Sequence, residues 1–267
     1  MKRVLILAVF LYFSILFTKI ITISLIVKDF DYDNGMKRNN IFDFCCIQCG
    51  RRLQIAAHGL CSFCYKQIKT FHYCGCCGTK LPEDRQRCGI CLLTPPLWQK
   101  IVFVSAFEDP LQSLIYRFKF QQDYWLDRSL ARLLLLAVKE ARRTHQLNLP
   151  ELLIPVPLHH RRQWQRGYNQ SSLLARYLSR WLNIPCLENV VVRQRATSTQ
   201  RGKNSRQREQ NMQQAFALKQ RLPAQIKRIA LIDDVITTGA TMEAICRCLM
   251  QQELAEIQVW ALCRTQK

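Results

Sequence analysis

Ile229-Ala-Leu-Ile-Asp-Asp-Val-Ile-Thr-Thr-Gly-Ala-Thr241 carries the clearest indication of the fold in this sequence. The apolar run at residues 229–232 predicts a short buried strand, which ends at the carboxylates Asp233 and Asp234. A small, hydroxyl-rich turn follows, and apolar residues then recur at helical spacing over residues 242–253. The predicted order is therefore a strand, an acidic pair, a loop and a helix.

This order of elements can hold a phosphate next to a diol. Backbone N–H groups of the loop and of the first helical turn converge on one spot, where the helix dipole favours an anion. Gly239 lets the backbone approach the anion closely, and the threonine hydroxyls can donate hydrogen bonds. The two carboxylates can accept hydrogen bonds from neighbouring hydroxyls. The expected ligand therefore carries a ribose 5-phosphate.

The same stretch resembles the thirteen-residue fingerprint of the type I phosphoribosyltransferases, which is a hydrophobic strand, two acids, an apolar pair and T-T-G-x-T. The resemblance implies that Asp233 and Asp234 hold the ribose hydroxyls of phosphoribosyl pyrophosphate and would be the catalytic carboxylates. It implies that the 5-phosphate binds to the loop formed by Thr237, Thr238, Gly239, Ala240 and Thr241. Mg²⁺ would accompany the phosphoribosyl pyrophosphate.

The chain is strongly basic. Its 267 residues include 39 Lys and Arg against 19 Asp and Glu, which gives a net charge of +20. Small phosphorylated molecules alone do not require so large an excess, which is typical of proteins with a polyanionic partner. The length allows one α/β domain of ordinary size and a small additional module.

The N-terminal extension, residues 1–35, is mostly apolar between Val4 and Val27 and is long enough to span a bilayer. A signal peptide is disfavoured because there is no small-x-small cleavage site and because export would oxidise a thiolate cluster. A membrane anchor is one alternative. The favoured interpretation is that Met36 is the true start, so that the preceding residues are translated upstream sequence.

A cysteine module occupies residues 36–96 and contains four C-x-x-C pairs. Tetrahedral zinc is commonly held by four thiolates from two such pairs, so we expect two zinc ribbons in tandem with one or two structural zinc ions. Cys45 could replace Cys46, Cys76 is an additional cysteine, and the pairs could also interleave. Few apolar residues remain here, so this module should need metal to fold. The expected ligands are Cys46, Cys49, Cys61, Cys64, Cys74, Cys77, Cys88 and Cys91.

Residues 97–267 read as strands that alternate with helices, which predicts an α/β domain with a parallel sheet and helices on both faces. The expected strands cover residues 101–107, 152–158, 187–192, 215–218, 229–232 and 257–262. The ligand should lie at the C-terminal ends of the strands, where Asp233 and the basic loops would meet. The fold class is thus a type I phosphoribosyltransferase-like domain preceded by a small zinc-ribbon module.

Two basic segments flank this expected site. A loop with Arg161, Arg162 and Arg166 follows the second strand. A sixteen-residue arm, residues 193–208, carries six cations and hardly any apolar side chain, so it cannot pack into a core. Arg166, Arg193 and Arg195 are candidates for neutralising a pyrophosphate. The expected contacts to nucleic acid are Lys119, Arg161, Arg162, Arg201, Lys203, Arg206 and Arg208.

The succession of motifs resembles the competence protein F family from about residue 42 to the end of the chain. These motifs are the C-x-x-C ribbons, I-P-V-P-L at residues 154–158, R-G-Y-N-Q at 166–170, R-x-R-x-T-x-x-Q at 193–200 and the acidic fingerprint. One departure is that residues 201–206 are more basic than the family pattern, which puts in doubt how this loop closes. The resemblance implies a cytoplasmic protein that is needed for natural transformation. A position at the inner face of the cytoplasmic membrane is left open.

Three functions remain open at this point. The first is a competence factor that binds incoming single-stranded DNA, phosphoribosyl pyrophosphate and DNA-translocation or recombination proteins, with membrane contact left open. The second is an active phosphoribosyltransferase that transfers ribose 5-phosphate to an unknown acceptor. The sequence offers no general base and no acceptor pocket for the second function. A pure adaptor held by the ribbons is a third alternative.

Overall fold

A computed structural model describes residues 45–55, 58–158, 163–164, 166–194 and 215–266. The described residues belong to one compact unit, so the cysteine module packs against the α/β domain. The apolar N-terminal stretch lies outside the described residues. Within the part of the chain that the structure describes, no helix has both the length and the apolar character needed to cross a membrane.

The main sheet has four parallel strands in the order β1-β6-β5-β2. Leu153 of β2 lies opposite Ala230 of β5, and Val102 of β1 lies opposite Trp260 of β6. The strands are almost continuously apolar because both faces of the sheet are covered. Their bounds are β1 Lys100–Ala106, β2 Leu152–Pro155, β5 Arg228–Ile236 and β6 Glu256–Arg264.

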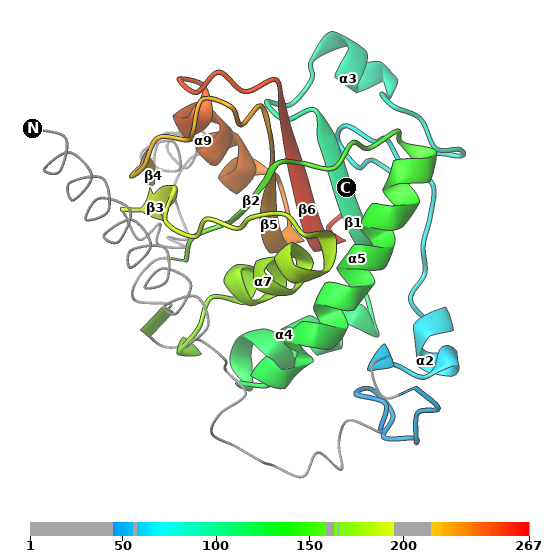
Figure 1. Ribbon diagram of the computed structural model, residues 1–267. Helices are drawn as coiled ribbons and strands as arrows, with labels where there is room; N and C mark the ends of the chain where they lie inside the picture. The colour runs from blue at the N-terminus through cyan, green and yellow to red at the C-terminus, as the bar shows by residue number, and fades with distance from the viewer. Residues whose placement is uncertain (1–44, 56–57, 159–162, 165, 195–214, 267) are drawn as a thin grey trace, which may run out of the picture. The chain divides into compact units, whose positions relative to one another are not determined.

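Helices cover both faces of this sheet, as the sequence predicted (Figure 1). The helices α4, α5 and α7 pack on one face, and α9 packs on the other. In the cysteine module, two short helices each carry the last ligand of a cysteine group. The helix bounds are α2 Ser62–Lys66, α3 Gly89–Leu93, α4 Leu111–Phe120, the 3-10 helix η3 Tyr124–Leu126, α5 Asp127–Thr144, α7 Gln170–Leu182 and α9 Ala240–Leu249.

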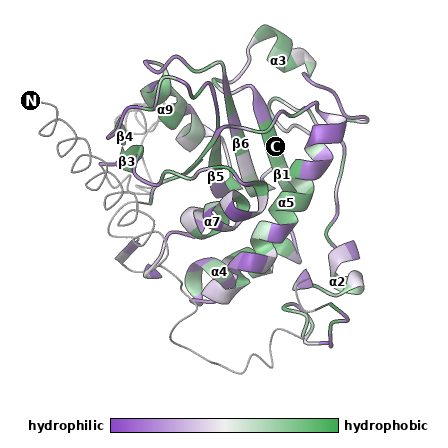
Figure 2. Cartoon of the chain, viewed as in Figure 1, coloured by the Kyte–Doolittle hydropathy of each residue, from purple (hydrophilic) through white to green (hydrophobic). Residues whose placement is uncertain are grey.

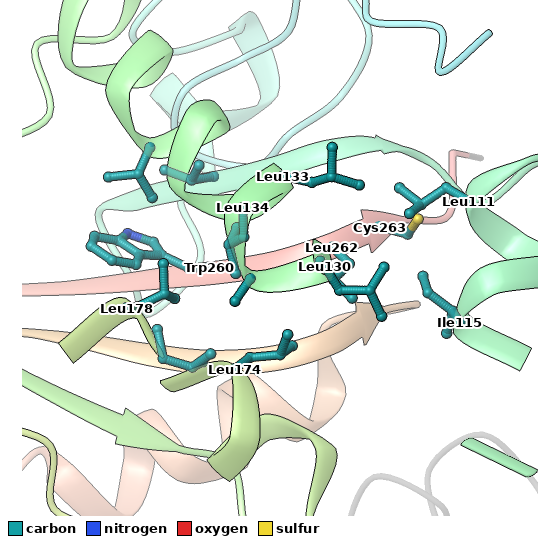
Figure 3. Packing of buried hydrophobic residues seen from close by; sticks show 14 of the residues in the cluster. Leu111, Ile115, Leu130, Leu133, Leu134, Leu174, Leu178, Trp260, Leu262 and Cys263 are labelled. Carbon is teal, nitrogen blue, oxygen red and sulfur yellow. The ribbon is translucent and has the colours of Figure 1, made fainter. Parts of the chain in front are cut away.

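The largest core cluster lies between β6 and the three helices on its face (Figure 3). Leu134 of α5 and Leu178 of α7 surround the fully buried ring of Trp260. The ribbon of α5 changes between purple and green along its length in Figure 2, as expected for a helix with one buried face. Cys46, Leu60 and Cys64 belong to the same cluster, so the first half of the cysteine module is anchored in the core of the domain.

Two of the expected strands lie outside the main sheet. β3 (Val191–Arg193) and β4 (Phe216–Leu218) form a separate antiparallel pair. The expectation that all strands join one parallel sheet was therefore wrong for these two. Val191 and Phe216 bury their side chains in the cluster that covers the α9 face, and the Cys248 thiol of α9 donates to the Phe216 carbonyl. Packing against α9 thus holds this pair.

Candidate functional site

The acidic pair lies near the C-terminal end of β5. The strand runs on to Ile236, so Asp233 and Asp234 are its sixth and seventh residues rather than the first residues after it. Asp234 is buried, and its Oδ1 forms an ion pair with Lys119 Nζ at 2.8 Å. Lys119 belongs to the last turn of α4, so this ion pair joins the helix to the strand.

Asp233 is held by a different helix. Its Oδ1 accepts hydrogen bonds from Ser171 Oγ at 3.0 Å and from the Asp234 N–H at 2.9 Å. Ser171 is in the first turn of α7, where its N–H donates to the capping side chain of Asn169 at 3.1 Å. The Asn169 amide also donates to the Val156 carbonyl at 3.0 Å, which ties the start of α7 to the end of β2. The serine is therefore fixed relative to the sheet.

The two carboxylates differ in their surroundings. Burial raises the pKa of Asp233 to about 7, and the negative charge of Asp234 adds to the increase. Lys119 and the hydrogen bonds from the Asp234 N–H and from Ser171 act in the opposite direction. Asp233 is consequently a carboxyl group that exchanges its proton near neutrality.

The loop between β5 and α9 has the geometry of an anion cradle. Gly239 adopts φ +84°, and α9 begins at the next residue, Ala240. The Ala240 N–H points toward Thr238 Oγ1 at 3.3 Å, and the side chains of Thr237 and Thr238 are exposed. Thr241 is half-buried in the first turn. Backbone donors, exposed hydroxyls and a helix N-terminus thus meet at one edge of the sheet, next to the carboxylates.

Trp98 packs directly against this loop. A Cβ atom on Gly239 would lie 2.9 Å from Trp98 Cη2, so only glycine fits there without movement. The indole N–H of the buried Trp98 donates to the Cys76 carbonyl at 2.8 Å. The N–H of Leu97 lies 3.3 Å from Glu243 Oε1, in the first turn of α9. The loop is therefore supported from the cysteine module.

The cysteines fall into two groups of four, whose sulfur atoms all lie within 4.8 Å of one another. Cys46, Cys49, Cys61 and Cys64 form the first group, and Cys74, Cys77, Cys88 and Cys91 form the second. The Sγ atoms of Cys49 and Cys61 are 3.7 Å apart, as are those of Cys77 and Cys88. A tetrahedron with Zn–S bonds of about 2.3 Å has edges of about 3.8 Å. The residues present thus fit a structural zinc ion in each group.

The structure also decides the register of the cysteines. The pairs combine in chain order without interleaving, and Cys45 and Cys76 stay outside both groups. The buried Cys76 thiol instead points toward the Trp98 carbonyl at 3.9 Å. Gly50 and Gly78, which follow the first pair of each group, adopt positive φ angles and turn the chain.

The first cysteine group is connected to α4. Arg117 Nη1 donates to the Ile47 carbonyl at 2.7 Å, and its Nε pairs with Asp123 at 2.8 Å. Ile47 lies between the first two cysteine ligands, and Arg117 is two residues from Lys119. The first cysteine group therefore contacts α4, whose Lys119 pairs with Asp234. The second contacts Trp98, which packs against Gly239.

The basic residues expected at the site are described only in part. Arg166 Nη1 donates to Gln170 Oε1 at 3.1 Å, and its guanidinium lies 5.0 Å from the ring centre of Phe120. Arg193 is on β3, with its guanidinium 5.3 Å from the ring centre of Phe216. Lys119, expected to contact nucleic acid, is engaged with Asp234. The other expected residues, Arg161, Arg162, Arg195, Arg201, Lys203, Arg206 and Arg208, lie outside the described residues.

Sequence reasoning missed Ser171 and Trp98. Ser171 stands in an otherwise ordinary helix start, and only the preceding asparagine cap marks its position. Trp98 follows Pro95-Pro96, where the sequence suggests a boundary rather than a contact to a loop 141 positions further on. Neither contact leaves a local pattern in the sequence.

The pKa of Asp233 predicts a stability that falls with rising pH. The folded protein holds this proton more tightly than the unfolded chain, whose carboxyl titrates near its ordinary value of 3.8. The stabilisation that Asp233 contributes is fully present below pH 3.8 and is lost as the pH rises to about 7. Urea unfolding of the unsubstituted protein and of Asp233→Asn is measured from about pH 5.5 to 8. The difference between their free energies of unfolding should change with pH. Parallel curves would contradict the assignment.

Comparisons with known proteins give a consistent picture. The chain is 54% identical over 228 residues to "Competence protein F" of Haemophilus influenzae, which covers 84% of this chain and 99% of that protein. It is 42% identical over 221 residues to "DNA utilization protein YhgH" of Escherichia coli K12, covering 82% and 96%. "Competence protein ComFC" of Bacillus subtilis is 26% identical over 166 residues, covering 61% of this chain and 63% of that protein.

Among solved structures, a purine phosphoribosyltransferase from Pyrococcus horikoshii Ot3 is similar at 17% identity, with a TM-score of 0.31 over 51% of this chain and 71% of that chain. No protein-family model matches the sequence. The 54% identity extends over nearly all of the Haemophilus protein. The chain therefore belongs to the competence protein F family.

Proposed function

We propose that this protein is a competence factor for DNA uptake in natural transformation. In this role it handles incoming single-stranded DNA in the cytoplasm, at the inner face of the membrane, on a scaffold that binds phosphoribosyl pyrophosphate. The competence role is supported by the names of the relatives, one of which matches at 54% identity. DNA-translocation or recombination proteins are the partners that such a role requires.

Binding of phosphoribosyl pyrophosphate is supported by one arrangement of residues. Two carboxylates, fixed by Lys119 and Ser171, lie next to a glycine loop that opens a helix. In the proposed complex, the carboxylates accept hydrogen bonds from the ribose hydroxyls, and the loop N–H groups and threonine hydroxyls hold the 5-phosphate. Mg²⁺ would neutralise the pyrophosphate oxygens. Arg166 lies four residues before the start of α7, donates to Gln170 there and can add a positive charge.

The experiment pairs a binding measurement with a transformation assay on Asp233→Ala/Asp234→Ala. Calorimetric titration should show binding of phosphoribosyl pyrophosphate with Mg²⁺ to the unsubstituted protein, and loss of that binding in the variant. Transformation frequency should fall if the small ligand regulates DNA handling. The proposed ligand is wrong if the unsubstituted protein does not bind it. A transformation frequency that is unchanged in a variant that no longer binds would instead favour an adaptor.

The raised pKa of Asp233 favours a second candidate function, an active phosphoribosyltransferase. A carboxyl group that titrates near neutrality can accept a proton from an attacking nucleophile at physiological pH. The expected signature is release of pyrophosphate from phosphoribosyl pyrophosphate in the presence of one of a panel of bases and amines. Binding without release across the whole panel would leave the site as a sensor.

A further inference from the structure

We propose that exposed aromatic side chains on α4 and η3 form a stacking platform for the unpaired bases of single-stranded DNA, an inference that rests on the proposed function. The platform consists of Tyr116, Phe120, Tyr124 and Trp125. Each of these residues is between 46% and 58% exposed. Single exposed apolar side chains are common on protein surfaces, but four large rings in one region call for a partner.

The rings of the platform are held in place by neighbouring groups. Tyr116 and Phe120 are one turn apart on α4, with ring centres 5.0 Å apart. Tyr124 meets Trp125 edge-on at 5.7 Å and also meets Tyr168 edge-on at 6.4 Å. The Tyr168 hydroxyl donates to the Phe118 carbonyl, which fixes its ring against α4. Side chains already ordered in this way lose little freedom when a base stacks on them.

The charge around the platform fits a nucleic acid. The Arg166 guanidinium lies over Phe120, and Arg128 is exposed in the first turn of α5, three residues after Trp125. The carboxylate of Asp123 is engaged by Arg117. The whole chain carries a net charge of +20. Aromatic faces interleaved with cations are the combination that binds single strands without sequence preference.

A protein partner is the less suitable occupant for this surface. The exposed large apolar side chains of α4 and η3 are all aromatic, and each belongs to the platform. Rings with accessible faces and flanking cations suit flat bases and phosphates. The exposed aliphatic side chains lie elsewhere among the described residues, at Ile55 and at Ile90, Leu92 and Leu93 of α3. The chemistry at α4 and η3 therefore favours nucleic acid.

The platform is adjacent to the proposed ribose phosphate site, which consists of Asp233, Asp234 and the loop to Thr241. Phe120 directly follows Lys119, whose ammonium group pairs with Asp234. Arg166 connects the two regions, because it contacts the Phe120 ring and also Gln170 in the first turn of α7, one residue from Ser171. A strand stacked on the platform would pass close to that site.

The test uses fluorescence anisotropy with a labelled oligothymidylate of about 16 nucleotides. The variant is Tyr116→Ala/Trp125→Ala. The matched control is Phe63→Ala/Trp181→Ala, which removes two exposed rings outside the platform. Loss of two stacking contacts should weaken binding at least about tenfold, whereas the control should bind like the unsubstituted protein. An abasic oligonucleotide of the same length should bind equally to the variant and to the unsubstituted protein.

The outcomes separate the platform from the proposed function. If the unsubstituted protein binds neither probe, DNA handling itself is wrong. If it binds oligothymidylate and the platform variant binds as tightly, the platform is wrong. An equal loss of affinity for both probes in the variant would also overturn the platform, because a stacking surface must distinguish bases from a bare backbone.

Discussion

Substituting Cys74 and Cys91 by serine is expected to weaken binding of phosphoribosyl pyrophosphate at least about tenfold, although neither residue belongs to the ribose phosphate site. Thiolates hold a structural zinc ion far more tightly than hydroxyls do, so the second group should lose its metal. The apolar cluster of the second group consists of Leu81 and the cysteines themselves, and Phe71 and Tyr73 just before it pack on Phe103 of the domain. This segment should therefore lose its fold together with the metal.

The loss would reach the loop between β5 and α9 through Trp98. The Cys76 carbonyl, which accepts the indole N–H, lies between two ligands of the second group. The Ile101 N–H also donates to the Gly75 carbonyl at 2.8 Å, so the start of β1 depends on the same turn. Without this turn, the indole ring that packs against Gly239 loses its anchor. The loop N–H groups would then no longer be held ready for an anion, and ordering them would cost binding free energy.

The measurement is calorimetric titration of phosphoribosyl pyrophosphate, together with zinc content and limited proteolysis. Cys45→Ser is the matched control, because Cys45 lies in the same module but outside both cysteine groups. It should keep its zinc and its affinity. Loss of zinc from the Cys74→Ser/Cys91→Ser variant with unchanged affinity would show that the second group does not support the loop.

The sequence predicted the elements of the main sheet because each is marked by a local pattern. The apolar runs of β2, β5 and β6 are buried on both faces, and the periodic helices α5 and α7 are buried on one. Periodicity does not state which strands pair. The short β3 and β4 looked like members of the parallel sheet, whereas packing against α9 places them in a separate pair.

The candidate site was predictable where its chemistry is contiguous in the chain. Asp233, Asp234 and the loop to Thr241 follow one another, so their order alone indicated a ribose phosphate. The supports come from distant positions. Lys119 is 115 positions before Asp234, and a lysine in a helix end reads equally well as a surface cation. Cysteine spacing gave two groups of four, but only the three-dimensional arrangement excludes Cys45 and Cys76.

Gly239→Ala should also weaken binding of phosphoribosyl pyrophosphate at least about tenfold, for two separable reasons. The positive φ of +84° is costly for a residue with a side chain, by about 1–2 kcal/mol. The new Cβ atom would in addition lie 2.9 Å from Trp98 Cη2, which is closer than such atoms approach. Relief of this contact requires the loop or the indole to move, and either movement displaces the N–H groups that face the anion.

Two matched variants separate these contributions. Gly50 has a similar φ of +72°, and a Cβ atom there would have no atom within 4 Å, so Gly50→Ala reports the backbone cost alone in urea unfolding. Trp98→Phe removes the far ring that carries Cη2. Because this substitution also removes the indole N–H bond to the Cys76 carbonyl, Trp98→Phe is titrated alone as well. The loss of affinity caused by Gly239→Ala should be smaller in the Trp98→Phe background than in the unsubstituted protein. An equal loss in both backgrounds would show that the steric contact is not the cause.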